Sequence, residues 1–206
     1  NDSKINRCLF EYTDGDALRI YGDRNNLENN FFQNIDYTVS ELPGLMVTID
    51  ISGDKNIITK NTIRDVQASA TVSPGARSEF SYNNVTRTGR LQSDGSVFQG
   101  TTNSVADAII HHNWIYKTPK YALRFDAPGN DPNAAGQRGK MYNNVSFETN
   151  GIMVKGDHHY ISHNTVLNSI KNGIIILDEE NSNQNTYIQN NLVDKLSGHR
   201  SKNNFD

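Results

Sequence analysis

Apolar residues recur at every second position in two similar segments near the middle of the chain. When Ala122–Asp126 is aligned with Gly151–Lys155, the apolar residues coincide, while the residues between them differ. A period of two is the pattern of a β-strand with one buried face and one exposed face. The two segments therefore predict two copies of one strand, with Arg124, Asp126 and Lys155 on the exposed side.

A second motif, aliphatic-x-x-Asn-x-apolar, recurs along the chain and alternates with the strand motif. Its central positions define eight registers, at Cys8, Asn30, Asn61, Asn83, Asn113, Asn144, Asn164 and Asn191. The shortest spacing is 20 residues and the longest is 31. Helical repeats keep a stricter length, roughly 33 to 47 residues, so this irregular period predicts short strands joined by loops of variable length.

Short strands in such a repeat cannot bury their apolar face alone, and neighbouring coils must stack so that each backbone group pairs with the next coil. The sequence thus predicts an all-β fold, a parallel β-helix of about eight coils, as a single domain over residues 1–206. Asparagine tolerates left-handed geometry at a bend and bonds its counterpart in the next coil, so we expect a ladder of side chains. Neither end shows a capping helix, so we expect either a piece of a longer solenoid or partners that cover its ends. We expect Gln67–Ala76, in coil three, to form only a poor strand.

Composition narrows the possible partners. The chain has 28 asparagines among 206 residues, and the ladder explains much of that excess. A net charge of -3 with mixed signs argues against a nucleic-acid partner, and no apolar run reaches the length of a membrane span. The single cysteine, Cys8, stands in the ladder column and excludes an internal disulfide framework. No signal peptide is visible, and nothing indicates an oligomeric state.

When coils stack about 4.8 Å apart, the equivalent outward residues of successive coils line up along the solenoid, and we call each such row a file. We expect one file of Tyr21, Ser52, Gln99, Asp126, Lys155 and Leu177, and a second file of Arg19, Asp50, Val97, Arg124, Met153 and Ile175. Polar residues of these files gather in coils four to six, whereas coil seven is apolar. The expected result is a cationic spot formed by Arg124 and Lys155 beside Asp126, or alternatively a solvated ion pair without further role.

Histidines suggest a metal site that their spacing does not support. His112 and His163 share a register two coils apart, roughly 9.6 Å by the strand spacing, which is too far for one zinc ion. We therefore predict no metal bound by histidine. Calcium at the acidic segment 178–180 remains an option, although no loop has a recognisable calcium spacing, and no cofactor is required.

The NNxF-like, HNWIY and HNTV segments and the GIMVKGD strand resemble the right-handed parallel β-helices of the pectate-lyase-like superfamily. The resemblance covers nearly the whole chain as a fold pattern. It implies a secreted or periplasmic protein that acts on an acidic polysaccharide lying along the outer face of the solenoid. Lyases of the superfamily use a lysine or arginine as base and other cations to neutralise the uronate carboxylate. Lys155 and Arg124 match these roles by residue type and by predicted adjacency.

A β-elimination needs a base for the proton beside the carboxylate and a cation for the charge that develops there. We assign Lys155 as the base and Arg124 as the group that holds the carboxylate, with Asp126 beside them. His158 or His159 would protonate the leaving oxygen. The expected sugar contacts are Trp114, Tyr116 and Tyr121 by stacking, and Gln99, Arg19 and Asp94 by polar groups.

Two other functions stay open. A glycoside hydrolase would use Asp126 with a second carboxylate, either Asp94 or Asp157. The two carboxyl groups would lie about 5 to 5.5 Å apart for retention of configuration or about 6.5 to 9.5 Å apart for inversion. A third possibility is a non-catalytic solenoid, such as an adhesin or tailspike-like fragment, which only binds a glycan.

Overall fold

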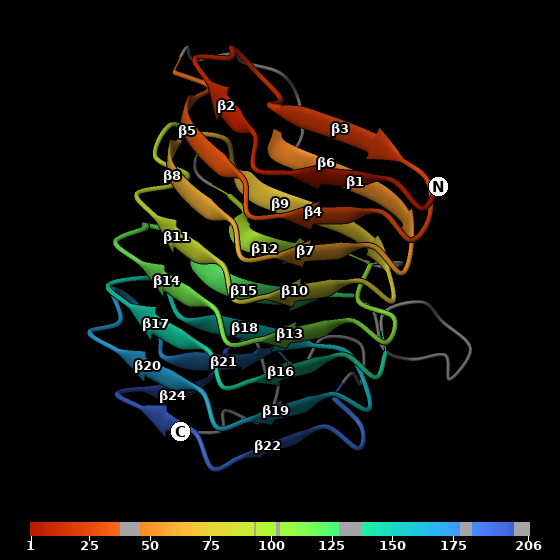
Figure 1. The fold of residues 1–206 in the computed structure, drawn as a ribbon. Coiled ribbons are helices and arrows are strands. Elements are labelled where there is room, and N and C mark those ends of the chain that lie inside the picture. Colours follow the sequence, from red (N-terminus) through yellow and green to blue (C-terminus); the bar gives the residue numbers. More distant parts are fainter. Residues whose placement is uncertain (38–45, 93, 102–103, 128–136, 178–182, 200–206) are drawn as a thin grey trace.

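The computed structural model describes residues 1–37, 46–92, 94–101, 104–127, 137–177 and 183–199. These residues form 24 strands and, within the described part of the chain, no helix. The strands build three parallel sheets of eight strands each, so one turn of the chain contributes one strand to every sheet. The predicted right-handed parallel β-helix of eight coils is confirmed, and the coils stack along one axis in Figure 1.

The first sheet contains the strand that precedes each ladder position. Its members, in order of stacking, are β1 (Lys4–Asn6), β4 (Asn26–Glu28), β7 (Ile57–Thr59), β10 (Glu79–Ser81), β13 (Ile109–His111), β16 (Lys140–Tyr142), β19 (Tyr160–Ser162) and β22 (Tyr187–Gln189).

The second sheet follows each ladder position. It comprises β2 (Leu9–Glu11), β5 (Phe31–Ile35), β8 (Thr62–Val66), β11 (Asn84–Thr86), β14 (Trp114–Tyr116), β17 (Val145–Phe147), β20 (Thr165–Leu167) and β23 (Leu192–Val193).

The third sheet has the longest strands. It comprises β3 (Leu18–Tyr21), β6 (Val47–Asp54), β9 (Ala70–Ala76), β12 (Ser96–Gly100), β15 (Tyr121–Asp126), β18 (Ile152–Lys155), β21 (Ile174–Leu177) and β24 (Leu196–His199).

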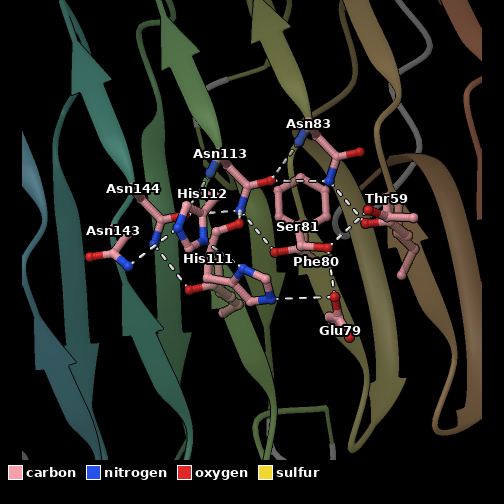
Figure 2. Close-up of polar contacts among 12 residues, drawn as sticks. Thr59, Glu79, Phe80, Ser81, Asn83, His111, His112, Asn113, Asn143 and Asn144 are labelled. Carbon is pink, nitrogen blue, oxygen red and sulfur yellow. Dashed lines mark hydrogen bonds and ion pairs between the residues drawn. The ribbon is translucent and has the colours of Figure 1, made fainter.

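The predicted asparagine ladder closes the bend between the first and second sheets. The Asn113 side-chain Nδ2 donates to Asn144 Oδ1 at 2.9 Å and to the Phe80 carbonyl at 2.8 Å, while Asn113 Oδ1 accepts from Asn83. Figure 2 shows this part of the ladder running across the coils. The same pattern continues to Asn191, and at the other end the Cys8 backbone N–H donates to Asn30 Oδ1. Each buried amide is thus satisfied by its equivalents above and below.

The left-handed geometry falls on the residue before the ladder asparagine, not on the asparagine itself as expected. Every one of these residues has a φ close to +55°: Arg7, Asn29, Lys60, Tyr82, His112, Asn143, His163 and Asn190. The physical reason is that the preceding residue makes the turn, so that the asparagine amide bonds to its equivalents in the coils above and below.

Two of our expectations for the third sheet are wrong. Segment 67–76, expected to be a poor strand, contains the seven-residue β9, because pairing with β6 and β12 overrides the weak strand propensity of its small residues. In coil four, Gln99 lies beside Arg124 rather than Asp126, and Val97 is buried. The register there is set by Phe98, which lies fully buried beside Leu123.

The core is a column of apolar side chains inside the three sheets. Phe10 stacks on Phe32 with ring centroids 4.5 Å apart, and Phe98 lies between Phe80 and Phe125 farther along. All outward residues are thereby held at the strand spacing, which fixes which side chains become neighbours. Across the residues with a described structure, no helix is long and apolar enough to cross a membrane.

Candidate functional site

The third sheet brings together the polar residues of coils four to six. In the sheet register, Gln99 of β12 lies beside Arg124 of β15, and Asp126 of β15 lies beside Lys155 of β18. The predicted neighbours Arg124, Asp126 and Lys155 therefore share one patch on the outer face. We call this patch, together with Gln99 and Asp94, the third-sheet site.

Arg124 bridges two carboxylates. Its Nη1 donates to Asp94 Oδ1 at 2.7 Å and its Nη2 donates to Asp126 Oδ2 at 2.5 Å, while the side chain is only 14% exposed. Burial raises the pKa of Asp94, but the hydrogen bonds from Arg124 and from the Gly95 N–H outweigh it, so the pKa lies below its usual value. Both carboxylates are held in place, and both terminal nitrogens of the guanidinium are already engaged.

Lys120 is a buried cation that sequence reasoning did not select. Its Nζ donates to the Asp94 carbonyl at 2.7 Å and also to the Gln92 carbonyl, and burial lowers its pKa to about 8. These bonds hold the segment that carries Asp94 against β15, so that Asp94 meets Arg124. Lys120 is a positioning residue, and no local pattern marks it, because its partners are carbonyl groups 26 and 28 residues away.

Two hydrogen-bond donors of the third-sheet site lack an acceptor. Gln99 Oε1 accepts from Ser96 Oγ at 2.8 Å, but Gln99 Nε2 and Arg124 Nε find no acceptor among the described residues. Both atoms are buried, where an unsatisfied donor costs about 1–3 kcal/mol. The two residues are paired in adjacent strands, so both unsatisfied donors belong to the same part of the third sheet.

An apolar cluster borders this site on the side of coil seven. Met153, Ile175 and Leu177 are buried on the outer face of the sheet, and Tyr121 packs against them. This packing argues against the sugar-stacking role that we expected for Tyr121. The cluster gives the third-sheet site an apolar edge and supports the expectation that polar contacts end at coil six.

The two neighbouring histidines after β18 have different environments. His158 is exposed and has a φ of 58°, whereas His159 is fully buried against the ring of Phe125. The Gly139 N–H donates to His159 Nδ1 at 3.0 Å, so Nε2 carries the proton and donates to the Lys155 carbonyl at 3.1 Å. Burial lowers the His159 pKa to about 4. This argues against His159 as the proton donor, and it leaves His158 for that role.

Three other expected substrate contacts lie outside the third-sheet site. Trp114 and Tyr116 belong to β14 in the second sheet, where Trp114 is 54% exposed. Arg19 lies in coil one and forms ion pairs with Asp16 and Asp50. Sequence alternation predicts that these side chains face outward, but it does not tell which of the three outer faces they share.

Of the residues that the structure describes, no group of three or more His, Cys, Asp or Glu side chains is arranged to hold a metal ion. The candidate calcium segment 178–180 lies outside the described residues.

A family model described as "Right handed beta helix region" matches residues 1–130. Neither the curated proteins nor the solved structures contain a match to this chain.

Proposed function

Because the chain belongs to the right-handed β-helix family, whose fold is often carbohydrate-active, we propose that it degrades an acidic polysaccharide bound over coils four to six of the third sheet. The sugar units would lie across β12, β15 and β18, at right angles to the strands.

The observation that supports this proposal most is the pair of unsatisfied donors, Gln99 Nε2 and Arg124 Nε. A uronate carboxylate supplies two oxygen acceptors on one carbon atom, which suits two N–H groups in adjacent strands. The guanidinium adds positive charge at this position. Because Asp94 and Asp126 already occupy the terminal nitrogens, the carboxylate would meet the Nε edge of Arg124 and not its terminal fork.

The reaction we propose is β-elimination. Lys155 takes the proton from the carbon atom beside the carboxylate, the electron pair forms a carbon–carbon double bond, and the bond to the leaving glycosidic oxygen breaks. Negative charge builds on the carboxylate during this step, and Arg124 and Gln99 stabilise it. His158 gives a proton to the leaving oxygen. The products are a new chain end and an unsaturated uronate.

A hydrolase is the second candidate, and the bridging by Arg124 favours it. One guanidinium binds both Asp94 and Asp126, which brings two carboxylates to one place, as glycoside hydrolysis requires. The lowered pKa of Asp94 suits a base or nucleophile. Asp157 is a poor partner, because it is buried and its Oδ1 accepts from the Gln184 N–H.

Binding without turnover is the third candidate. Its support is that Arg124 is held by two ion pairs, which is the arrangement of a stable ladder as much as of a catalytic group.

The test is incubation with pectate, alginate, ulvan and glycosaminoglycans, followed by absorbance of the unsaturated uronate and by assay of new reducing ends. We expect the absorbance to rise with one of these substrates.

Lys155→Ala should lower kcat at least 100-fold, and Lys155→Arg should be nearly as severe because guanidinium keeps its proton. Arg124→Ala should raise KM and lower kcat together. Lys117→Ala, an exposed lysine in coil five, is the matched control and should have no effect.

Each other outcome selects an alternative. New reducing ends without unsaturated product, together with loss of activity in Asp126→Asn, would establish the hydrolase. Binding of a polysaccharide without either product would establish the binding protein. Full activity in both Lys155→Ala and Arg124→Ala would contradict the third-sheet site.

A further inference from the structure

An open hollow lies at the corner where the second sheet leads into the third, in coils one and two. It has a volume of about 440 Å³, and the described residues that line it are Tyr12, Thr13, Asp14, Asn34 and Tyr37. These residues lie beside the ends of β2 and β5, in the N-terminal part of the solenoid in Figure 1. The third-sheet site belongs to coils four to six, so the two places do not overlap. We call this hollow the two-tyrosine pocket.

Hydrogen bonds between the two coils fix the shape of the two-tyrosine pocket. The Tyr12 N–H donates to the Asn34 carbonyl at 3.1 Å, and the Asp36 N–H donates to the Thr13 carbonyl at 2.8 Å. The two corners are therefore held against each other by the backbone. The Tyr37 hydroxyl donates to Asn34 Oδ1 at 3.3 Å, which orients the Tyr37 ring. One tyrosine thus comes from each coil, and both are attached to the same ordered corner.

The two tyrosine rings are open to a ligand. Tyr12 is 77% exposed and Tyr37 is 54% exposed, and both side chains line the same hollow. A tyrosine ring is apolar, and the π-electrons give its face a partial negative charge. Two such rings in one pocket attract a cation that lies over their faces.

The charges around the two-tyrosine pocket are mainly negative. Asp14 lines it and is exposed, and none of the described lining residues is basic. Asp36 is only 2% exposed, and its pKa is raised, first by burial and then by the nearby carboxylates of Asp14 and Asp16. The Arg19 guanidinium of coil one is shared between Asp16 and Asp50, so two carboxylates already offset its charge. The corner therefore carries an excess of negative charge, and Asp14 is the carboxylate that a ligand can reach.

A reachable carboxylate beside two aromatic rings matches the ammonium group of a cationic ligand. The ammonium group donates charge-assisted hydrogen bonds to the Asp14 carboxylate, and its charge is attracted to the rings of Tyr12 and Tyr37. A uronate would be repelled by Asp14, so the acidic polysaccharide proposed for the third-sheet site does not fit here. A neutral sugar would pack on the rings but would leave the negative charge of the pocket unmatched.

We propose that the two-tyrosine pocket binds the ammonium group of a cationic ligand. An amino sugar, a polyamine and a quaternary amine such as choline share this chemistry, and the experiment separates them. The proposal does not depend on the function proposed for the third-sheet site.

The experiment measures binding to the full chain by calorimetry at low salt. The ligands are a tetramer of glucosamine, spermidine and choline. A tetramer of N-acetylglucosamine is the matched control ligand, because it has the same sugar rings without the ammonium groups. We expect a cationic ligand to bind at least tenfold more tightly than the acetylated tetramer, and added salt to weaken its binding. The ligand that binds most tightly identifies the source of the ammonium group.

Variants of the lining residues locate the binding. Asp14→Asn keeps the shape of the side chain and removes its charge, so it should weaken binding at least tenfold. Tyr12→Ala and Tyr37→Ala should each weaken it about threefold. Asp107→Asn and Tyr187→Ala are the matched controls, because they remove a solvent-accessible carboxylate and an exposed tyrosine elsewhere on the solenoid. Both controls should bind like the parent, and the circular dichroism spectrum and Tm of each variant check that it folds.

Three results would overturn the two-tyrosine pocket. They are binding of none of the three cationic ligands, unchanged affinity in Asp14→Asn, and unchanged affinity in both tyrosine variants. Equal affinity for the acetylated tetramer would overturn the assignment to an ammonium group. A loss in Asp107→Asn as large as that in Asp14→Asn would show a general attraction of cations to an acidic protein, which would also overturn the pocket.

Discussion

Two files of residues run side by side along the bend between the first and second sheets, and they differ in composition. The inner file is asparagine in seven of eight coils, whereas the outer file, one residue earlier, contains lysine, tyrosine, histidine, arginine and asparagine. Both files have the same backbone path, with a φ near +55° in the outer file throughout. The backbone therefore does not explain why one file is uniform and the other is varied.

The difference comes from the partners of each side chain. An inner side-chain amide such as that of Asn113 bonds only to its own equivalents and to buried carbonyls. Every coil therefore needs an amide at the equivalent position. An outer side chain such as His112 meets solvent and whatever lies beside it. In this solenoid, uniform files hold the coils together, and the varied files are the places where binding chemistry can arise.

The same contrast recurs at another corner, between two adjacent histidines. His158 takes the left-handed position and is exposed, while His159 points inward and is fully buried. Neighbouring residues of one type thus have different roles, which depend only on the side of the backbone they occupy.

The inner file should be the most sensitive to substitution. Asn113→Leu removes the acceptor of Asn83 and the donor to the Phe80 carbonyl, so several buried groups lose a partner at about 1–3 kcal/mol each. We expect a loss of roughly 3–5 kcal/mol in the free energy of unfolding by urea titration. Asn84→Leu, one position beyond the ladder and exposed, is the control and should change stability by less than about 0.5 kcal/mol. Similar effects for both would mean that the ladder does not hold the coils together.

The buried histidine of this pair, His159, should make the stability of the protein depend on pH. The folded-state pKa of His159, about 4, lies below the ordinary 6.5, so the unfolded chain binds the proton first as the pH falls. Stability is therefore full above pH 6.5 and declines toward pH 4, by on the order of 2–3 kcal/mol. His159→Gln should remove this decline, and His158→Gln should keep it. Urea titrations across this pH range measure it, and a decline that persists in His159→Gln would contradict the assignment.

The outer file should respond to backbone strain and not to side-chain chemistry. At Lys60, where φ is 57°, we expect Lys60→Val to be about 1–2 kcal/mol less stable than Lys60→Gly. The order should reverse at Thr62, two residues later in β8, where valine suits an extended strand better than glycine. Thermal unfolding of the four variants measures these differences in stability. The same order at both positions would show that the bend carries no strain.

We expect the smallest loss of stability when an exposed ion pair between neighbouring coils is removed. Arg138 donates to Asp107 at 2.9 Å, but both side chains are largely open to solvent. We expect Arg138→Gln to change the unfolding free energy by less than about 0.5 kcal/mol, and added salt to reduce even this difference. A loss near that of Asn113→Leu would show that exposed ion pairs between coils stabilise the solenoid as strongly as the buried ladder does.

Four features could be predicted from the sequence alone: the solenoid, its eight coils, the inner ladder and the grouping of Arg124, Asp126 and Lys155. Each of these depends on a pattern that repeats along the chain: alternation marks the strands, and the recurrent asparagine marks the bend. In a parallel stack, equivalent positions become neighbours, so the repeats alone predict such contacts.

How these neighbours are arranged in the candidate site depends on packing that the repeat pattern does not show. The pairing of Gln99 with Arg124 depends on how Phe98 packs, and the burial of His159 depends on Phe125 and Gly139 in other turns. Lys120 is placed by carbonyl groups that have no side-chain signature. These features depend on packing between distant residues and on loops of unequal length, for which a local sequence pattern carries no signal.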